Sequence, residues 1–326
     1  MFKKNLVGVL VSSTFTFASA VQSADLNSVL TQALAQDPDV LEAANVRMSR
    51  LQEIDQAKAG YKPTLDLNAG YGYEYTDSPG TRDRLNPPDD HGDEDLDRGE
   101  FGLTLRQTLF DGKYTDNDVE LQQARTDSAT SRLYAVADDI SLDIVKAYLD
   151  VIYQREVLML SEENLQVHQR IQDQSRLRSD AGVGRRADLD QINARVALVE
   201  ANLIASKVNV QDAITTYKRR TGVEPEETLE PVPSVKESLP AEVEEAIELG
   251  KAENQVLRQA GFDIEAANAA NRAASSNDYP FIYLEVAGNL NNDLDGTDGH
   301  YNDATAMLKM QYNLYNGGRD QAKKKQ

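Results

Sequence analysis

The sequence predicts a mainly α-helical protein with four β-strands, in which a long antiparallel coiled-coil hairpin is joined to strands that contribute to a membrane β-barrel shared between copies. Three observations support this fold class: an internal repeat, a segment from Tyr114 to Asp180 without glycine or proline, and four segments that alternate apolar with polar residues. A repeat of this kind determines the architecture before any single residue is given a role.

Each copy of the repeat has a helical run, a proline, an alternating strand, a loop, a second alternating strand and a stop of the form aromatic-x-Gly. The first copy contains Pro63 and ends at Gly112, and the second contains Pro280 and ends at Gly317. The copies are offset by 280 − 63 = 217 residues at the prolines and by 314 − 109 = 205 at the last leucines. The first copy therefore has a loop about 12 residues longer, as is usual for surface connections.

Residues 1–20 have the pattern of an export signal peptide. Two lysines precede an apolar stretch, and residues 18–20 read Ala-Ser-Ala, the small residues of a cleavage site. At about a dozen residues, the apolar stretch is shorter than the roughly 20 that a spanning helix needs. The mature chain then begins near Val21, or near Asp25 if cleavage follows Ala24. A buried N-terminal helix is the alternative interpretation.

The composition excludes several classes of site. The chain has no cysteine, which rules out disulfides, thiol nucleophiles, cysteine-bound metals and a cysteine-linked lipid anchor. Its formal charge is −20, from 34 basic and 54 acidic residues, and loss of the two signal lysines makes it −22. Such a surface repels nucleic acid, so no nucleic-acid partner is expected. No later segment is long and apolar enough for a spanning helix, so any insertion into a membrane must use strands.

Two helices are expected to lead into the strands. The first lies within 21–62, where apolar residues recur at helical spacing. The dipeptide Asp37-Pro38 should kink or restart it, because proline cannot continue a helix. The second helix lies within 241–279 and repeats the first. The repeat therefore places one helix before each strand pair.

Between these helices, residues 113–221 are expected to form a long antiparallel hairpin with coiled-coil packing. An uninterrupted helix from Tyr114 to Asp180 would be about 100 Å long at roughly 1.5 Å per residue. The hairpin would turn at Gly182-Val183-Gly184. The segment 222–240, which is rich in proline and glutamate, is expected to be an irregular equatorial linker.

Two strand pairs are expected within 63–112 and 280–317. From Leu65 to Tyr75 the alternation puts leucine and tyrosine on one face and aspartate, asparagine, glycine and glutamate on the other. Four strands of about ten residues with one apolar face match a sheet between lipid and a wet interior. A soluble antiparallel sheet packed on helices gives the same alternation, so this pattern leaves both interpretations open.

Four strands are too few to close a membrane barrel, because the smallest such barrels use about eight. Unpaired strand edges are not tolerated in hydrocarbon. If these strands lie in lipid, other copies of the chain must complete the sheet.

In their order and spacing, several segments resemble the TolC family of trimeric outer-membrane efflux and secretion channels. The resemblance covers essentially the whole mature chain as far as Gly318. The segments that carry it are Gly60-Tyr61-Lys62-Pro63-Thr64-Leu65, Leu109-Phe110-Asp111-Gly112, Ala181-Gly182-Val183-Gly184-Arg185-Arg186-Ala187-Asp188-Leu189 with Ala194-Arg195, and Leu314-Tyr315-Asn316-Gly317-Gly318.

The resemblance implies a homotrimer in the outer membrane of a Gram-negative bacterium, with a periplasmic extension. Each protomer would give four strands to a shared barrel, and a helical tunnel would continue it across the periplasm. The periplasmic end would dock on an adaptor protein linked to an inner-membrane pump or ABC transporter. The expected function is a passive export conduit in a tripartite efflux or type I secretion system. The alternative is a periplasmic coiled-coil adaptor or an adhesin-like structural protein.

The resemblance also implies roles for particular residues. The hairpin tip that contacts the adaptor would consist of Gly182, Val183, Gly184, Arg185 and Asp188, and Asp188 and Asp190 would be the acidic residues near the tunnel mouth. A plain helix–helix turn would need glycine as well, so a structural role is the alternative for the glycines. The strand residues expected to face outer-membrane lipid are Leu65, Leu67, Tyr71, Tyr73, Phe101, Leu103, Leu105, Ile282, Leu284, Leu308, Met310 and Tyr312.

The repeat predicts a second long hairpin, of which residues 318–326 would be the start. The family places much of the gate and the inner coil of the tunnel in that hairpin. We therefore expect an incomplete fold, either because the sequence is cut short or because the chain is a degenerate half-module. Activity would then belong to a longer parent.

The sequence supports no enzymatic chemistry, cofactor or metal site. His91, His168 and His300 lack the spacing of metal ligands. The acidic segment 77–97 is expected to be a solvated outer loop, with cation binding as the alternative. Residues 291–296 resemble the start of a calcium loop, but the twelfth position is an asparagine instead of the required glutamate. A hairpin turn is expected there.

Overall fold

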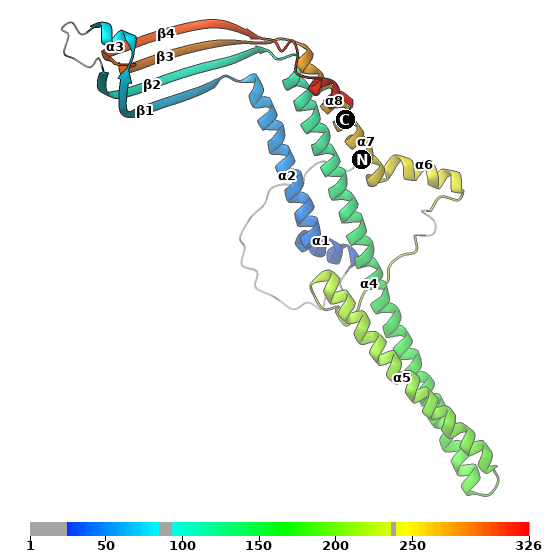
Figure 1. Cartoon of the computed structure of the whole chain (residues 1–326). Coiled ribbons are helices and arrows are strands. Elements are labelled where there is room, and N and C mark those ends of the chain that lie inside the picture. The colour runs from blue at the N-terminus through cyan, green and yellow to red at the C-terminus, as the bar shows by residue number, and fades with distance from the viewer. Residues whose placement is uncertain (1–24, 85–92, 236–238, 326) are drawn as a thin grey trace. The chain divides into compact units, whose positions relative to one another are not determined.

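The computed structural model describes residues 25–84, 93–235 and 239–325. Within these ranges the chain forms eight α-helices, two short 3-10 helices and four β-strands, which confirms the predicted mainly α-helical fold (Figure 1). The chain divides into two compact units. The first comprises Met1–Asp37 with Asp139–Ser238, and the second comprises Pro38–Asp138 with Leu239–Gln326.

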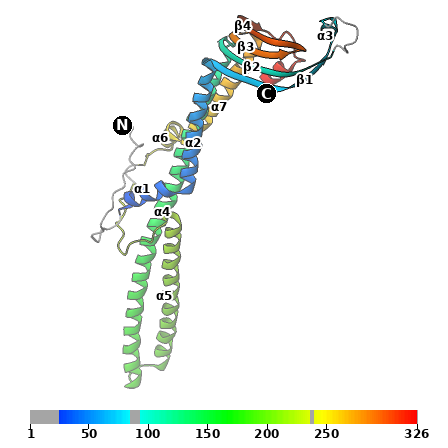
Figure 2. The same ribbon diagram turned by 90° about the vertical axis from the view of Figure 1, so that its left-hand side faces the viewer.

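The first unit contains the predicted antiparallel hairpin except for the first part of its long helix, residues 114–138, which belongs to the second unit. Helix α4 spans Tyr114–Asp180, the bounds expected from its lack of glycine and proline, and α5 spans Arg186–Thr221. The arms of the hairpin run side by side (Figure 2). Buried residues of α5 recur at three- and four-residue spacing, as at Ile192, Val196 and Val199, which is the seam of a coiled coil.

One polar pair lies in this seam and a second lies on the exposed surface near the tip, and both join the two arms of the hairpin. The hydroxyl of Ser206 lies 3.0 Å from that of Ser161 on the opposite helix. Closer to the tip, the Gln172 amide donates to Asn193 at 2.8 Å. A shift in register would break both hydrogen bonds and separate the buried Ser206 hydroxyl from its partner on α4, so each pair favours one alignment of α4 and α5.

The core of the first unit lies between α1, Leu26–Gln36, and the base of the hairpin. Tyr148 and Tyr217 are its largest fully buried side chains, with ring centroids 6.4 Å apart. Burial raises the pKa of both phenols. The Tyr148 hydroxyl donates to the backbone carbonyl of Glu230 at 2.9 Å, so the buried phenol is hydrogen-bonded.

The linker after α5 is irregular, as predicted, but α4 holds its first part in place. Gly222 ends α5 with a left-handed backbone, φ 77°. The Arg155 guanidinium then donates to the carbonyls of Glu226 at 2.6 Å and Glu227 at 2.9 Å. Together with the Tyr148 bond, these contacts give the linker a defined path along the helix.

In the second unit, the two copies of the repeat have the same order of elements. In the first copy, α2, Pro38–Lys58, and the short helix η1, Ala59–Tyr61, precede β1. In the second copy, α6, Val243–Glu253, α7, Gln255–Ala274, and η3, Ser275–Asp278, precede β3. The final helix, α8, is Arg319–Lys325. Among the described residues, no helix is both long and apolar enough to cross a bilayer.

Both helical runs of the repeat are broken at the same place. The predicted restart at Asp37-Pro38 is confirmed, because α1 ends at Gln36 and α2 begins at Pro38. The second run was expected to repeat the first, and Asn254 interrupts it and caps α7 by accepting a hydrogen bond from the Leu257 amide at 3.0 Å. The interval 254 − 37 = 217 equals the offset of the prolines, so the break belongs to the repeat.

The four strands form one antiparallel sheet in the order β1-β2-β3-β4 (Figure 1). Their bounds are Thr64–Asp77, Asp93–Phe110, Phe281–Leu294 and Thr297–Gln311. At 14, 18, 14 and 15 residues, they are longer than the predicted ten.

The prediction of one loop over 77–97 was wrong in two respects. The helix α3, Pro79–Arg84, lies at its start, and the acidic residues 93–97 belong to β2, where they pair with residues 73–77 of β1. The charged side chains of this segment do not prevent it from forming a strand. Strand pairing satisfies the hydrogen-bonding needs of its backbone amides and carbonyls. Asp89, Asp90 and His91 lie outside the described residues.

The second hairpin turns as predicted but ends earlier than predicted. Asp295 and Gly296 form a two-residue turn with φ 53° and 70°, as in a type I′ hairpin. Strand β4 ends at Gln311, so the prediction that Tyr312 is a strand residue was wrong. The next residue, Asn313, accepts a hydrogen bond from the Tyr315 amide at 3.0 Å, a local turn that competes with further strand pairing.

Candidate functional site

One face of the sheet gathers the strand residues predicted to meet lipid. Leu65 lies opposite Leu105, and Leu284 lies opposite Leu308. Since residues directly opposite in an antiparallel pair share a face, the strands build one continuous apolar surface. The predicted residues that the register brings onto this face are Leu65, Leu67, Tyr71, Tyr73, Phe101, Leu103, Leu105, Ile282, Leu284, Leu308 and Met310.

This apolar face is open in the described part of the chain. Tyr71 is 81% exposed, Leu308 68% and Leu103 43%, while Ile282 is half-buried. A soluble sheet packed on its own helices would bury such side chains. The described helices of the second unit therefore do not form that arrangement with the sheet.

The apolar face has the height of a bilayer interior. From Ile282 to Leu290 there are 290 − 282 = 8 residue steps, or about 27 Å along the strand at roughly 3.4 Å per residue. A tilt of about 40° reduces this to about 21 Å, close to the apolar band of roughly 25 Å on membrane barrels. Beyond the band, Tyr73 lies opposite Asp97 and Tyr75 opposite Asp95, so aromatic and charged residues border it.

A β-bulge in β2 changes which side chain joins the apolar face. Thr108 lies opposite Tyr283 but Phe110 lies opposite Ile282, so Leu109 is the extra residue. Strict alternation places Leu109 on the apolar face, and that prediction was wrong, because the bulge puts Phe110 there instead. No residue type in this segment marks the bulge.

The opposite face of the sheet carries paired charges near the helices. The Arg106 guanidinium lies 3.0 Å from the Glu285 carboxylate, and the Lys309 ammonium lies 2.5 Å from its other oxygen. Arg106 also lies 4.9 Å from the centre of the Tyr283 ring. The sequence placed these residues on the polar face but gave no sign that they pair across β2, β3 and β4.

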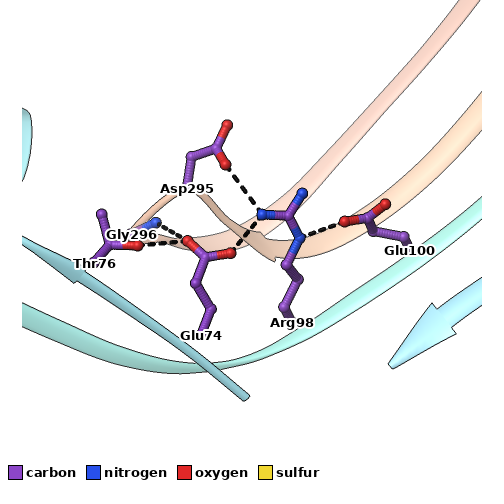
Figure 3. Close-up of polar contacts among 6 residues, drawn as sticks. All are labelled: Glu74, Thr76, Arg98, Glu100, Asp295 and Gly296. Carbon is purple, nitrogen blue, oxygen red and sulfur yellow. Dashed lines mark hydrogen bonds and ion pairs between the residues drawn. The ribbon is translucent and has the colours of Figure 1, made fainter. Parts of the chain in front are cut away.

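A second charged cluster lies at the far end of this polar face (Figure 3). Arg98 pairs with Glu74 at 2.6 Å, with Asp295 at 3.1 Å and also with Glu100. Glu74 further accepts hydrogen bonds from the Thr76 hydroxyl at 2.6 Å and the Gly296 amide at 3.0 Å. The Arg106 side chain is 50% exposed and that of Asp295 is 79% exposed, and charged groups with this exposure favour a hydrated environment on this face of the sheet.

The predicted hairpin tip is a tight turn between α4 and α5. Gly182 has a left-handed backbone, φ 70°. The amides of Val183 and Gly184 both donate to the Arg178 carbonyl, at 3.0 and 2.9 Å, which closes the end of α4. The Val183 side chain is 80% exposed and contributes nothing to this turn.

The remaining tip residues lie at the start of α5. Arg185 is its N-cap and accepts a hydrogen bond from the Asp188 amide at 3.1 Å. Asp188 lies in the first helical turn, where a carboxylate is favoured by the helix dipole. Asp188 and Asp190 are both exposed, but residues two apart on a helix do not share a face, so the structure does not bring them together.

Two of the three histidines lie in the described part of the chain, His168 on α4 and His300 on β4. Among the residues that the structure describes, no group of three or more potential ligands is placed to hold a metal ion. His168 contacts the carbonyl of Asn164 on its own helix at 3.0 Å, and His300 lies on β4 opposite Asn292.

A sheet with one open apolar face, joined to a long helical hairpin, is the arrangement that the sequence resemblance implied. Residues 29–222 match the family model described as "Outer membrane efflux protein". The chain belongs to the outer membrane efflux protein family. This membership confirms the predicted resemblance and places the protein in the outer membrane of a Gram-negative bacterium, with a periplasmic extension. The family is one of transport proteins.

Individual relatives agree with this assignment. The outer membrane efflux protein BepC of Brucella suis is 27% identical over 320 residues, covering 98% of this chain and 66% of BepC. The outer membrane protein TolC of Vibrio cholerae is 23% identical over 325 residues, covering 97% of this chain and 70% of TolC. The chain thus spans about two thirds of the length of these relatives.

A solved structure shows the same fold. The crystal structure of CusC, reported in connection with transmembrane channel formation, has a TM-score of 0.74 to this chain. At 15% identity, the match covers 96% of this chain and 72% of CusC. This likeness concerns the fold alone.

Proposed function

We propose that the chain is a protomer of a trimeric outer-membrane conduit in a tripartite efflux or type I secretion system. Three copies would contribute three times four strands, twelve in all, to one barrel. The apolar face would meet lipid and the polar face would line a water-filled pore. The conduit itself would be passive, and an inner-membrane pump or ABC transporter would supply the energy.

The open apolar face carries this proposal. Within the described residues β1 pairs with β2 alone and β4 with β3 alone, so both outer strands have a free edge. Since every neighbouring pair is antiparallel, β4 runs opposite to β1 and can pair with β1 of the next copy as a regular antiparallel partner. Closure by other copies would satisfy both edges, as a hydrocarbon environment requires.

The hairpin tip would supply the contact with a periplasmic adaptor. Val183 is exposed without a role in the turn, and an apolar side chain at an exposed tip is suited to a protein contact. The alternative, a periplasmic adaptor or adhesin with a soluble sheet, requires protein over the apolar face. The described helices of the second unit do not cover it.

A pair of neighbouring substitutions tests the assignment of the faces. Leu105 lies near the middle of the apolar band, and the adjacent Thr104 lies on the polar face. In the full-length protein, Leu105→Arg should deplete trimers from the outer-membrane fraction, because arginine facing the bilayer midplane costs about 2–4 kcal/mol. Thr104→Arg, the matched control, should leave the trimer level near that of the wild type.

The measurement is fractionation of cells followed by native gel analysis of the outer-membrane fraction. Equal depletion of trimers by Leu105→Arg and Thr104→Arg would contradict the assignment of one face of the sheet to lipid and the other to the pore. Recovery of the unmodified full-length protein in the soluble periplasm would overturn the proposed function as a whole.

A further inference from the structure

The turn between β3 and β4 leaves the plane of the sheet. Pairing between β2 and β3 stops at Gly99 and Asn292, beyond which β2 pairs with β1 alone. The turn nevertheless reaches β1, because the Gly296 amide donates to Glu74 there at 3.0 Å. To make this contact the hairpin end must bend across β2. Glu74 and Arg98 both lie on the polar face, so it bends toward that face (Figure 3).

Packing shows independently that the turn is seated on this surface. A side-chain carbon added at Gly296 would lie 2.6 Å from the Thr81 methyl group and 3.0 Å from Cβ of Thr76. Thr81 is 3% exposed. Glycine is thus required at this position both by the left-handed φ of 70° and by the closeness of the two threonines.

The charged cluster holds the turn on this surface. Arg98 lies between Glu74 on β1 and Asp295 in the turn, at 2.6 and 3.1 Å. The Glu74 side chain is only 14% exposed, so its bonds to Arg98, Thr76 and Gly296 are partly shielded from water. The turn is therefore fixed by hydrogen bonds, an ion pair and close packing together.

We infer that the turn Asp293–Gly299 is an inward-folded constriction at the outer end of the pore, with Glu74 and Arg98 as its latch. This inference depends on the proposed function, in which the polar face lines the pore. The latched end is the outer one, because the opposite end of each strand joins the helices of the periplasmic part. In a trimer three such turns would project into one lumen and limit its cross-section.

Single-channel conductance of the full-length protein in planar lipid bilayers tests the constriction. Gly296→Ala should displace the turn and raise conductance about twofold, since a pore conducts through its narrowest part. Gly70→Ala is the matched control, because Gly70 lies on the polar face of β1, outside the turn, with open space around it and no positive φ. Its conductance should equal that of the wild type.

The latch is tested in the same way. Glu74→Ala should raise conductance like Gly296→Ala, because it removes the acceptor of the Gly296 amide and a partner of Arg98. Glu285→Ala is the matched control, since Glu285 lies on the same face with two ion pairs and does not contact the turn. Its conductance should not rise.

A variant with an engineered disulfide tests the constriction while keeping the latch residues Glu74 and Arg98. The native chain has no cysteine, so Thr76→Cys with Gly296→Cys creates a single possible bridge per protomer. The disulfide should hold the turn against β1, so reductant should raise the conductance of the oxidised double variant about twofold. If the wild-type protein forms channels but all of these variants conduct equally, the inferred constriction is overturned and the proposed function is not. A wild-type protein that forms no channels would overturn the proposed function.

Discussion

At the scale of single residues, one hydrogen bond ties the first helix–strand joint to α4. The Tyr61 hydroxyl donates to the Asp116 carboxylate at 2.5 Å. This bond, reinforced by desolvation and by the negative charges of Asp116, Asp111 and Glu120, raises the pKa of Tyr61 to about 12. The joint is therefore coupled to the protonation of a phenol.

Because the bond needs the protonated Tyr61 phenol, the joint should lose stability at alkaline pH. Because the folded state raises the pKa of Tyr61, the bond stabilises the joint fully below the ordinary tyrosine pKa of about 10. Its contribution should disappear as the pH rises from about 10 to about 12. Asp116→Asn should return the pKa of Tyr61 toward about 10.

The measurement is the tyrosinate absorbance of the protein against pH, with a Tyr61→Phe variant subtracted to isolate one of the 14 tyrosines. Asp118→Asn removes a nearby carboxylate that does not contact Tyr61 and should leave the midpoint unchanged. A Tyr61 midpoint that is the same in wild type and Asp116→Asn would contradict the assignment.

Residue pairs were the part of the site that the sequence could not predict. Alternation assigned Glu74, Arg106 and Glu285 to polar positions, because side-chain direction in a strand depends only on parity. Their partners depend on register and on the bend of a hairpin. Arg98 and Asp295 lie 197 residues apart in the chain, and no local pattern connects them.

At the scale of elements, substitutions at the hairpin tip can distinguish a structural role from a role in binding. Gly182→Ala should destabilise the turn by about 1–2 kcal/mol, because the residue has a positive φ. Val183→Asp should leave the fold unchanged, because the Val183 side chain has no packing role, but it should reduce copurification of a periplasmic adaptor with the full-length protein. Thermal unfolding followed by circular dichroism and adaptor pull-down provide the two readouts.

Val183→Thr, which keeps the shape of the side chain, serves as the matched control for the pull-down. Full adaptor binding by Val183→Asp would leave the tip with the role of a turn alone.

The elements themselves could be predicted to different degrees. The bounds of α4 follow from the absence of helix breakers, and the break at Asp37 follows from the next proline. The break at Asn254 has no proline and depends on a side-chain cap, a weaker signal. Strand β2 was predicted too short because an acidic run resembles a loop, and the bulge at Leu109 inserts a residue without changing the composition.

At the scale of the whole molecule, the proposed ring can be counted by cross-linking. The chain lacks cysteine, so Gly70→Cys on β1 can be combined in turn with a cysteine at Tyr301, Asp303 or Thr305 on β4. All four positions lie on the polar face, and β4 of one copy should pair with β1 of the next. At the matching register, oxidation should give covalent dimers and trimers on a denaturing gel.

Each single-cysteine variant is the control and should stay monomeric on that gel, since one cysteine cannot bridge β4 to β1. A ladder that continues to tetramers would show that the ring holds more than three copies.

The open apolar face also affects how a newly made chain can reach the outer membrane. Until neighbours and acyl chains surround it, a single copy presents exposed leucines and tyrosines between two free strand edges. Surfaces of that kind adhere to one another in water. We therefore expect that, between the two membranes, a chaperone holds the newly made chain or its strands stay unfolded.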